Sequence, residues 1–380
     1  MNLLVLLLLP ALVFGFPFQN SSVLDDHGER LCGGTIEKLW IELVFVVDIS
    51  SGMGDSHLRK AGDSMKSIMQ GVQIGLHSSP QTTRVGIITY NNGITLRGLN
   101  SFGSYNDFSS TVDDIVNEGT SHSGSILGSS LQEAKKMFGR DVMNSRKQFQ
   151  KLVIVYGSKA TDDPISPAND LKNNGIKIAT VSVDSASASQ FGNIATKNWA
   201  NNLSDNDLKY NLRNSLMTTN CFCPDGFTQF RDRYGDDSSY GFGTCIHSDN
   251  AERTWIDAKG WCPALAKNGY LSNEYSQKKH DFIFNVVKAN RDLNNYRYFI
   301  GLSYYNNNWY WEQPNGLNRR QVDFTDWASG YPHSSGVVVK NVPTNGNAQW
   351  ENTDRNSDKA YFCCDVWTCD TDNYCDNSVV

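Results

Sequence analysis

The nine cysteines of this 380-residue chain are distributed so unevenly that they divide it into two parts. No cysteine occurs between Cys32 and Cys221, whereas eight fall within the last 160 residues. Disulfides persist in oxidising compartments and stabilise modules that bury only a small core. We therefore expect an exported protein whose first module depends on a hydrophobic core and whose second module depends on disulfides. The cysteines are Cys32, Cys221, Cys223, Cys245, Cys262, Cys363, Cys364, Cys369 and Cys375.

Residues 1–15 have the composition of a secretory signal peptide. They are nearly all Leu, Val and Ala, are interrupted by Pro10, and end at Gly15, a small residue that suits cleavage. The run is too short to cross a bilayer, and no later run approaches the length of a membrane span. We expect a secreted, extracellular protein. Asn20 and Asn202 each begin an Asn-x-Ser pattern, which predicts glycosylation.

Length and charge limit what the chain can be and what it can bind. A length of 380 residues is enough for two ordinary domains. The formal net charge is −6 and there is no basic run, which argues against nucleic acid as a partner.

Residues 36–218 alternate short apolar runs with stretches of helical spacing. The clearest strand candidates are 41–47, 152–156 and 176–183, and residues 58–74 place apolar side chains at helical intervals. Short apolar strands separated by helices predict an α/β doubly wound module, in which helices cover both faces of a mostly parallel sheet. In such sheets ligands bind beyond the carboxyl ends of the strands.

The residues at the end of the first strand carry a family resemblance. The sequence from Phe45 to Met53, FVVDISSGM, resembles the signature of von Willebrand factor A domains. In that family an Asp-x-Ser-x-Ser motif, a distant Thr and a distant Asp form a metal ion-dependent adhesion site. Mg²⁺ takes about six hard oxygen ligands, which explains why hydroxyl and carboxylate side chains are used. The resemblance implies a metal that accepts a carboxylate from a partner protein.

This chain departs from the motif at two ligand positions. Asp48 and Ser50 match and Ser121 aligns with the Thr, but Gly52 and Gly157 stand at the second Ser and the distant Asp. The remaining set supplies few oxygens and a single charge. We therefore expect no metal cofactor here, or only weak binding of Mg²⁺. The alternative role for Asp48 and Ser50 is to organise the loop and cap the next helix.

The sequence pattern changes at Cys221. Residues 223–227 begin a hairpin, Phe299-Ile300-Gly301-Leu302 is close to a Trp-Ile-Gly-Leu strand, and residues 349–352 read Gln-Trp-Glu-Asn. In this order the motifs resemble long-form C-type-lectin-like domains, which implies an α+β fold over residues 221–368.

Aromatic residues of this module invite two interpretations. In the lectin-like family the four tryptophans between residues 309 and 350 belong mostly to the core, although such rings can also stack on sugars. Tyr304, Tyr305 and Tyr310 are less constrained, and we expect some of them to present a binding face.

Calcium-using members of the family bind sugars through two short motifs. A Glu-Pro-Asn or Gln-Pro-Asp tripeptide on a long loop and an Asn-Asp pair after a Trp supply oxygens to Ca²⁺. Here the loop reads Tyr-Pro-His at 331–333, and Glu351 and Asn352 follow Trp350. Half of the site is missing, so we expect at most weak Ca²⁺ binding. His333, Glu351 and Asn352 remain the candidate ligand-binding residues.

The lectin-like resemblance also implies two disulfides. It pairs Cys223 with Cys245 and Cys262 with Cys363. Cys364 is then left over, and we expect it to stay unpaired or to link two chains into a disulfide-bonded dimer.

Two further pairs follow from position. Cys32 and Cys221 bracket the first module, so a bond between them would join its ends. Cys369 and Cys375 would close a small loop within the short tail, residues 369–380.

The function expected from these features is binding. The chain contains no His-Glu-x-x-His, Gly-x-Ser-x-Gly or phosphate-binding glycine motif, so we do not expect an enzyme. The order of its modules resembles secreted lectin-like proteins of nematodes. That resemblance implies recognition of a glycan or other microbial surface ligand by the second module, in innate defence. The alternative is an extracellular adhesion or matrix protein that uses the lectin fold as a scaffold to bind another protein.

Overall fold

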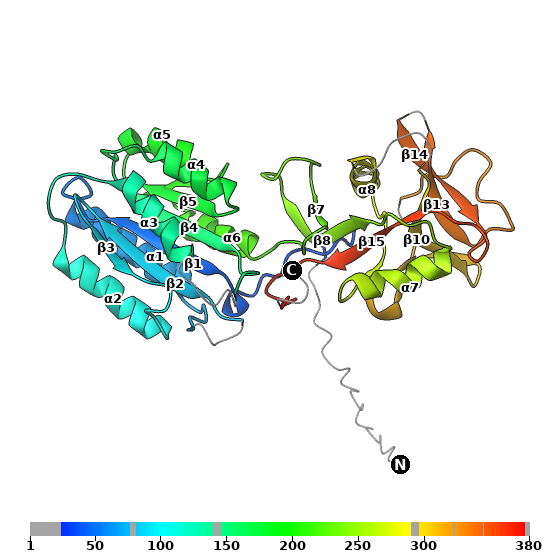
Figure 1. Ribbon diagram of the computed structural model, residues 1–380, viewed down its shortest axis with the longest axis horizontal. Helices are drawn as coiled ribbons and strands as arrows, with labels where there is room; N and C mark the ends of the chain where they lie inside the picture. The colour runs from blue at the N-terminus through cyan, green and yellow to red at the C-terminus, as the bar shows by residue number, and fades with distance from the viewer. Residues whose placement is uncertain are drawn as a thin grey trace, which may run out of the picture.

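The computed structural model describes residues 24–76, 81–139, 146–289, 296–321, 324–344 and 346–376. The expected signal peptide and the Asn20 pattern lie outside these residues. Two modules lie next to each other along the long axis of the molecule (Figure 1). Within the described ranges, no helix combines the length and the apolar character needed to cross a bilayer.

The first module is an open twisted sheet, six-stranded over the described residues, with the order β3-β2-β1-β4-β5-β6. Every neighbouring pair is parallel except β2 and β3. This confirms the mostly parallel α/β class. The strands are β1 (Glu42–Asp48), β2 (Arg84–Tyr90), β3 (Ile94–Arg97), β4 (Lys151–Gly157), β5 (Lys177–Ser182) and β6 (Ala200–Asn202).

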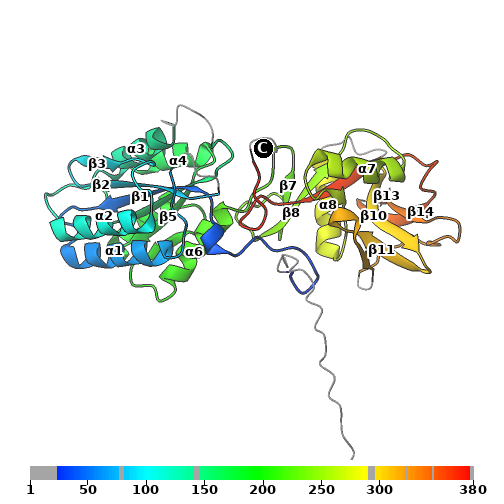
Figure 2. The same cartoon turned by 90° about the horizontal axis from the view of Figure 1, so that it is seen from below.

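Helices cover both faces of this sheet because β1 is apolar on both faces. Phe45 and Val47 point into one hydrophobic cluster, and Val44 and Val46 point into the other. Figure 2 shows α1 and α6 on one side of the sheet and α3 and α4 on the other. The helices are α1 (Asp55–Met69), α2 (Tyr105–Glu118) and α6 (Leu208–Thr219) on the first face, with α3 (Leu127–Gly139), α4 (Ile165–Asn173) and α5 (Ser185–Ile194) on the second. A short 3₁₀ helix, η1 (Ile36–Lys38), precedes β1.

The second module has the expected α+β fold, and β10 lies at its centre. In the described part of the chain, β10 pairs in parallel with β15 and antiparallel with β11 and β13. Trp311 and Trp350 are at most 2% exposed, in line with a core role for the tryptophans. The elements are β7 (Thr228–Arg231), β8 (Gly241–Ser248), α7 (Trp255–Leu265), β9 (Tyr270–Leu271), α8 (Gln277–Ala289), β10 (Tyr298–Tyr305), β11 (Asn308–Glu312), η2 (Pro314–Gly316), β12 (Asn318–Arg320), β13 (Val338–Thr344), β14 (Asn347–Thr353) and β15 (Tyr361–Trp367).

Four disulfides are present in the described residues. Three join pairs that the sequence predicts, and these are Cys32–Cys221, Cys223–Cys245 and Cys369–Cys375. The fourth joins Cys262 to Cys364. The predicted Cys262–Cys363 pair is therefore wrong, and so is the expectation that Cys364 is left over to link two chains.

The two-residue period of a strand explains this correction. Cys363 and Cys364 are neighbours in β15, so their side chains point to opposite faces of the sheet. Cys364 lies in the cluster that contains Cys262 and Trp255 on α7. Cys363 is fully buried in the other cluster, together with Trp350.

The C-terminal tail packs between the two modules instead of extending away from them (Figure 1). Trp40, just before β1, meets the rings of Phe149, Phe222 and Tyr374 edge-on, with centroids between 4.9 and 5.6 Å apart. Its indole N–H donates to the carbonyl oxygen of Asp370 at 2.9 Å. The tail is thus part of the joint between the modules, which we define as residues 29–40, 220–222 and 368–376.

A buried ion pair holds the joint together. The Arg30 guanidinium donates to both carboxylate oxygens of Asp370, at 2.7 and 3.0 Å. Arg30 is 5% exposed and Asp370 is 1% exposed. Removal of either partner would leave the other charge buried without its counter-ion, so the pair fixes both chain ends against the second module.

A second buried charge cluster fastens the N-terminal segment to α8. The ammonium of Lys279 lies 2.9 Å from Glu29 Oε2 and 2.8 Å from Asp365 Oδ2, and donates to Asn273 at 2.5 Å. Burial raises the pKa of the Glu29 carboxyl to about 7, because Lys279 offsets only part of the desolvation.

The Glu29 shift predicts that stability falls as the pH rises. The folded pKa of about 7 exceeds the ordinary value of 4.5, so the folded state holds a proton that the unfolded state releases. The contribution of Glu29 is fully present below about pH 4.5 and is lost as the pH rises through about 7. Glu29→Gln should flatten this part of the pH profile, measured as the free energy of unfolding in urea. The exposed control Glu37→Gln should keep the wild-type slope, and a wild-type slope in Glu29→Gln would contradict the assignment.

The corrected disulfide predicts different costs at two adjacent cysteines. Cys364→Ala opens a bond between residues 102 apart in sequence, which should lower the free energy of unfolding by about 4 kcal/mol. Cys363→Ala removes only a buried thiol and should cost about 1 kcal/mol. Denaturant unfolding with peptide mapping under non-reducing conditions measures both. A larger loss for Cys363→Ala, or a mapped peptide joining Cys262 to Cys363, would contradict the structure.

Candidate functional site

Asp48 ends β1 at the carboxyl edge of the sheet, where parallel sheets bind ligands. Its side chain is fully buried, and both oxygens accept hydrogen bonds. Oδ1 accepts from Ser50 N–H at 2.8 Å, and Oδ2 accepts from the hydroxyls of Ser125 and Ser158 at 3.1 and 2.6 Å. The Ser158 N–H donates to Oδ2 as well, at 3.1 Å. Donors from three loops therefore surround this carboxylate.

Of the other predicted adhesion-site residues, the structure brings Ser50 to Asp48 but not Ser121. Ser121 is exposed, and its hydroxyl lies 3.1 Å from Nδ1 of His122 and 3.4 Å from Nδ2 of Asn91. Ser125, four residues later, takes the position beside the carboxylate.

The backbone at Gly157 explains why no second carboxylate stands opposite Asp48. A Cβ at Gly157 would lie 2.6 Å from the Tyr90 hydroxyl, which is closer than real Cβ contacts, and 3.0 Å from the Asp48 Cβ, which is a tight contact. Tyr90 is fully buried, and burial raises the pKa of its hydroxyl well above the usual value. An aspartate at position 157 would therefore require Tyr90 to move.

The long loop of the second module is fastened to β14 by Asn352. This side chain is 6% exposed. Its Oδ1 accepts from His333 N–H at 2.7 Å, and its amide N–H group donates to the carbonyls of His333 and Gly336 at 2.6 and 2.8 Å. Partial burial and the nearby Glu351 carboxylate raise the pKa of the Tyr331 hydroxyl. Asn352 and Glu351, two of the three predicted ligand-binding residues, thus interact with residues of the loop. The third, His333, is exposed.

Beneath this loop, a buried charge network holds Trp350 in place. Glu274 accepts from the indole of Trp350 at 2.7 Å, from His280 Nδ1 at 2.8 Å and from Asn341 at 2.8 Å. Burial by itself lowers the pKa of His280, but Glu274 and Asp326 overcompensate and raise it to about 9. His280 is therefore a cation near neutral pH, and it supports the core.

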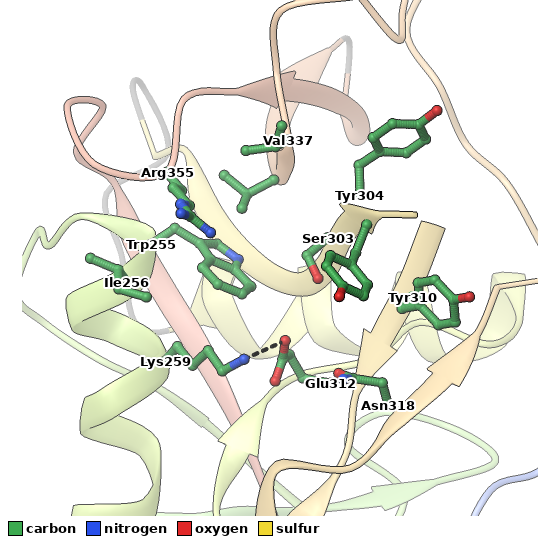
Figure 3. A pocket seen from close by; sticks show the side chains of 12 residues that line it. Trp255, Ile256, Lys259, Ser303, Tyr304, Tyr310, Glu312, Asn318, Val337 and Arg355 are labelled. Carbon is green, nitrogen blue, oxygen red and sulfur yellow. Dashed lines mark hydrogen bonds and ion pairs between the residues drawn. The ribbon is translucent and has the colours of Figure 1, made fainter. Parts of the chain in front are cut away.

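A cavity of about 430 Å³ opens between α7, the β10–β11 hairpin and the start of β13 (Figure 3). Its aromatic walls are Trp255, Tyr304, Tyr305 and Tyr310. The fractional exposure is 41% for Tyr304 and 66% for Tyr305, so both rings are available to a ligand. We call this cavity the aromatic pocket.

An ion pair forms one side of the aromatic pocket (Figure 3). Lys259 Nζ on α7 lies 2.8 Å from Glu312 Oε1 on β11. The Glu312 side chain is 4% exposed, and burial raises its pKa although Lys259 offsets part of the effect. Ser303 and Asn318 add polar groups to the lining. Apolar rings beside a few convergent polar groups are the usual composition of small-ligand sites.

Comparison with known families assigns both modules. The family model of the von Willebrand factor type A domain matches residues 42–215, and that of the C-type lectin domain matches residues 251–365. The chain joins a von Willebrand factor type A domain to a C-type lectin domain. Residues 42–215 are hereafter the A domain, and residues 251–365 are the lectin domain.

Several known proteins are similar to all or part of this chain. C-type lectin domain-containing protein 160 of Caenorhabditis elegans is 25% identical over 376 residues, which are 90% of this chain and 56% of that protein. The chain thus spans little more than half of that relative. The human collagen alpha-5(VI) chain is 25% identical over 182 residues, which are 47% of this chain and 6% of the collagen chain. Proximal thread matrix protein 1 of the mussel byssus, solved with a zinc-occupied MIDAS motif, aligns at 18% identity with a TM-score of 0.41, over 48% of this chain and 47% of that chain.

The A domain of this chain does not fit the metal that its family implies. A cation needs oxygen lone pairs, but Oδ2 of Asp48 already accepts three hydrogen bonds and Oδ1 accepts one, so N–H and O–H donors already use most of the acceptor sites of this carboxylate. The positions that would add a hydroxyl and a carboxylate are Gly52 and Gly157. Across the residues that the structure describes, no three His, Cys, Asp or Glu side chains lie close enough to share an ion.

The loop of the lectin domain does not fit Ca²⁺ either. Asn352 uses its amide to hold the loop, and the loop contributes a tyrosine and a histidine where carboxylate or amide oxygens would be needed. Of the residues that the sequence singled out, Tyr304, Tyr305 and Tyr310 are the ones that come together in a cavity. Sequence reasoning did not pair Lys259 with Glu312, because these two residues are distant in sequence.

Asn202, the second predicted glycosylation site, lies at the end of β6. Its amide nitrogen donates to the Ser182 hydroxyl at 3.2 Å, and its oxygen accepts from Ser204 N–H at 3.0 Å. The side chain is only partly exposed, and glycosylation there stays a prediction.

Because N–H and O–H donors surround Asp48, we predict that its substitution lowers the free energy of unfolding and that this loss is the same with and without metal. Asp48→Asn turns an acceptor into an N–H donor that faces Ser125 and Ser158, which should cost about 1–3 kcal/mol of unfolding free energy. Neither Mg²⁺ nor EDTA should move the urea midpoint of the wild type or the variant. The exposed control Asp114→Asn should be neutral. A midpoint that rises with Mg²⁺ in the wild type, but not in Asp48→Asn, would show that the site does bind metal.

Proposed function

We propose that this protein is an extracellular recognition protein whose lectin domain binds carbohydrate at the aromatic pocket, without calcium. The observation that carries the proposal is the convergence of exposed tyrosines and a partly buried Lys259–Glu312 pair in one cavity of the lectin domain. Four disulfides within the described residues support an oxidising, extracellular location.

The chemistry of the pocket suits a sugar. A pyranose ring has an apolar face that stacks on aromatic side chains, and hydroxyls at its rim that need hydrogen-bonding partners. Tyr304 and Tyr305 supply rings, while Glu312, Ser303 and Asn318 supply polar groups. The volume of about 430 Å³ lies within the range of about 300–1,000 Å³ that is usual for small-ligand sites.

The A domain fits a supporting or adhesive role in this proposal. Both matched families are binding domains, and we propose no catalytic activity. We further propose microbial surface glycans as the ligands and a role in defence, and the similarity to a C-type lectin domain-containing protein of Caenorhabditis elegans supports the lectin part of this proposal. The second candidate function is adhesion to an extracellular protein, which the match of the A domain to a collagen chain favours.

A glycan array tests the proposal. The purified chain should bind microbial wall polymers or glycans equally well in Ca²⁺ and in EDTA, because no residue of the aromatic pocket depends on a metal. Tyr305→Ala should weaken binding about tenfold through loss of a stacking surface. The matched control is Tyr210→Ala on the A domain, where the tyrosine is 73% exposed, and it should bind like the wild type.

Two results would count against the proposal. Binding that EDTA abolishes would show that the long loop builds a calcium site after all. Absence of binding in both buffers would favour adhesion to a protein partner.

A further inference from the structure

Arg355 adds a cationic side chain to the lining of the aromatic pocket. The described residues include no hydrogen bond or ion pair made by its guanidinium, which is exposed. The carboxylate of the adjacent Asp354 accepts from Asn356 N–H at 2.9 Å and from the N–H and hydroxyl of Ser357, both at 2.8 Å. All three bonds end on Oδ1 of Asp354 and hold this carboxylate in its own turn. Figure 3 shows the Arg355 side chain reaching toward Trp255.

The other charges of the pocket cancel each other. Lys259 and Glu312 form an ion pair, so two cationic residues and one anionic residue leave the lining with a net charge of +1. The whole chain has a formal net charge of −6. A positive pocket in an acidic protein favours a ligand with a negative group.

The Lys259–Glu312 pair is shared with a second hollow. This hollow has a volume of about 280 Å³, and its lining adds Asn268, Asn315 and Tyr270 to the two charged residues. A ligand that extends beyond one sugar ring can therefore cross the ion pair and meet amide groups on the far side.

From these contacts we propose that the ligand is a linear acidic saccharide, an inference that rests on the carbohydrate binding proposed above. Its carboxylate or sulfate pairs with Arg355, one ring stacks on Tyr305, and the chain continues across Lys259 and Glu312. Guanidinium presents a planar fork of donors that matches both carboxylate and sulfate oxygens. The exposed tyrosine rings favour a sugar over an acidic peptide, which lacks a broad apolar face.

Titration calorimetry with the full chain in EDTA tests this with three probes. They are a glucuronate-containing tetrasaccharide, its carboxyl-reduced neutral counterpart, and a tetraglutamate peptide. The wild type should bind the acidic tetrasaccharide about tenfold more tightly than the neutral one, and should bind the peptide weakly. A disaccharide of the same acidic unit should bind more weakly than the tetrasaccharide.

Arg355→Met keeps an unbranched apolar side chain and removes the charge. This variant should bind the acidic and neutral tetrasaccharides equally. Arg320→Met is the matched control, because Arg320 is an exposed arginine on β12 that does not line the pocket. It removes the same net charge and should retain the preference for the acidic probe.

The outcomes separate this inference from the proposed function. Equal binding of both tetrasaccharides by the wild type overturns the inference and leaves carbohydrate binding intact. An unchanged preference in Arg355→Met, or binding of the peptide as tightly as the acidic sugar, also overturns it. Absence of binding to any saccharide overturns the proposed function and this inference together.

Discussion

The buried ion pair between Arg30 and Asp370 is the contact on which the arrangement of the two domains depends. It lies where the N-terminal segment, the lectin domain and the C-terminal tail meet, and it is bidentate. Asp370 also accepts from Thr368 and from the backbone of its own loop, so its charge is compensated from several directions. A buried charge tolerates little displacement of its partners. The pair therefore positions Trp40 and the Cys32–Cys221 bond, which lead directly into and out of the A domain.

The same requirement, that a buried charge be compensated, is met at two further buried carboxylates. At the end of β1, hydroxyl and backbone donors surround the Asp48 carboxylate in place of a cation. Under the long loop of the lectin domain, the cation that balances Glu274 is His280. In both domains, donors that belong to the chain itself satisfy these buried carboxylates.

The aromatic pocket uses polar groups differently from these structural networks. Its Lys259–Glu312 pair is only partly buried, its tyrosine rings are exposed, and Arg355 reaches toward the cavity (Figure 3). Groups that are held in place by the fold but still accessible can exchange water for a ligand at modest cost. This difference in accessibility is why we place ligand binding at the pocket and a structural role at Asp48 and Asn352.

The sequence by itself determined the fold class of both domains and their order. Residues 41–47 are apolar on both faces of a strand, which requires helices on both sides, and the Phe-Ile-Gly-Leu strand with its following tryptophans belongs to one fold. Helix α2 was not predicted, although its buried residues Phe108, Val112 and Ile115 recur at helical spacing. Only the tertiary structure decided which of two adjacent cysteines pairs with Cys262, because that depends on which face of β15 each side chain occupies. The tertiary structure alone brought Ser125 and Ser158 to Asp48. It also brought Lys259, Glu312 and Arg355 to one cavity. These contacts join residues far apart in the chain, and no local sequence pattern encodes their positions.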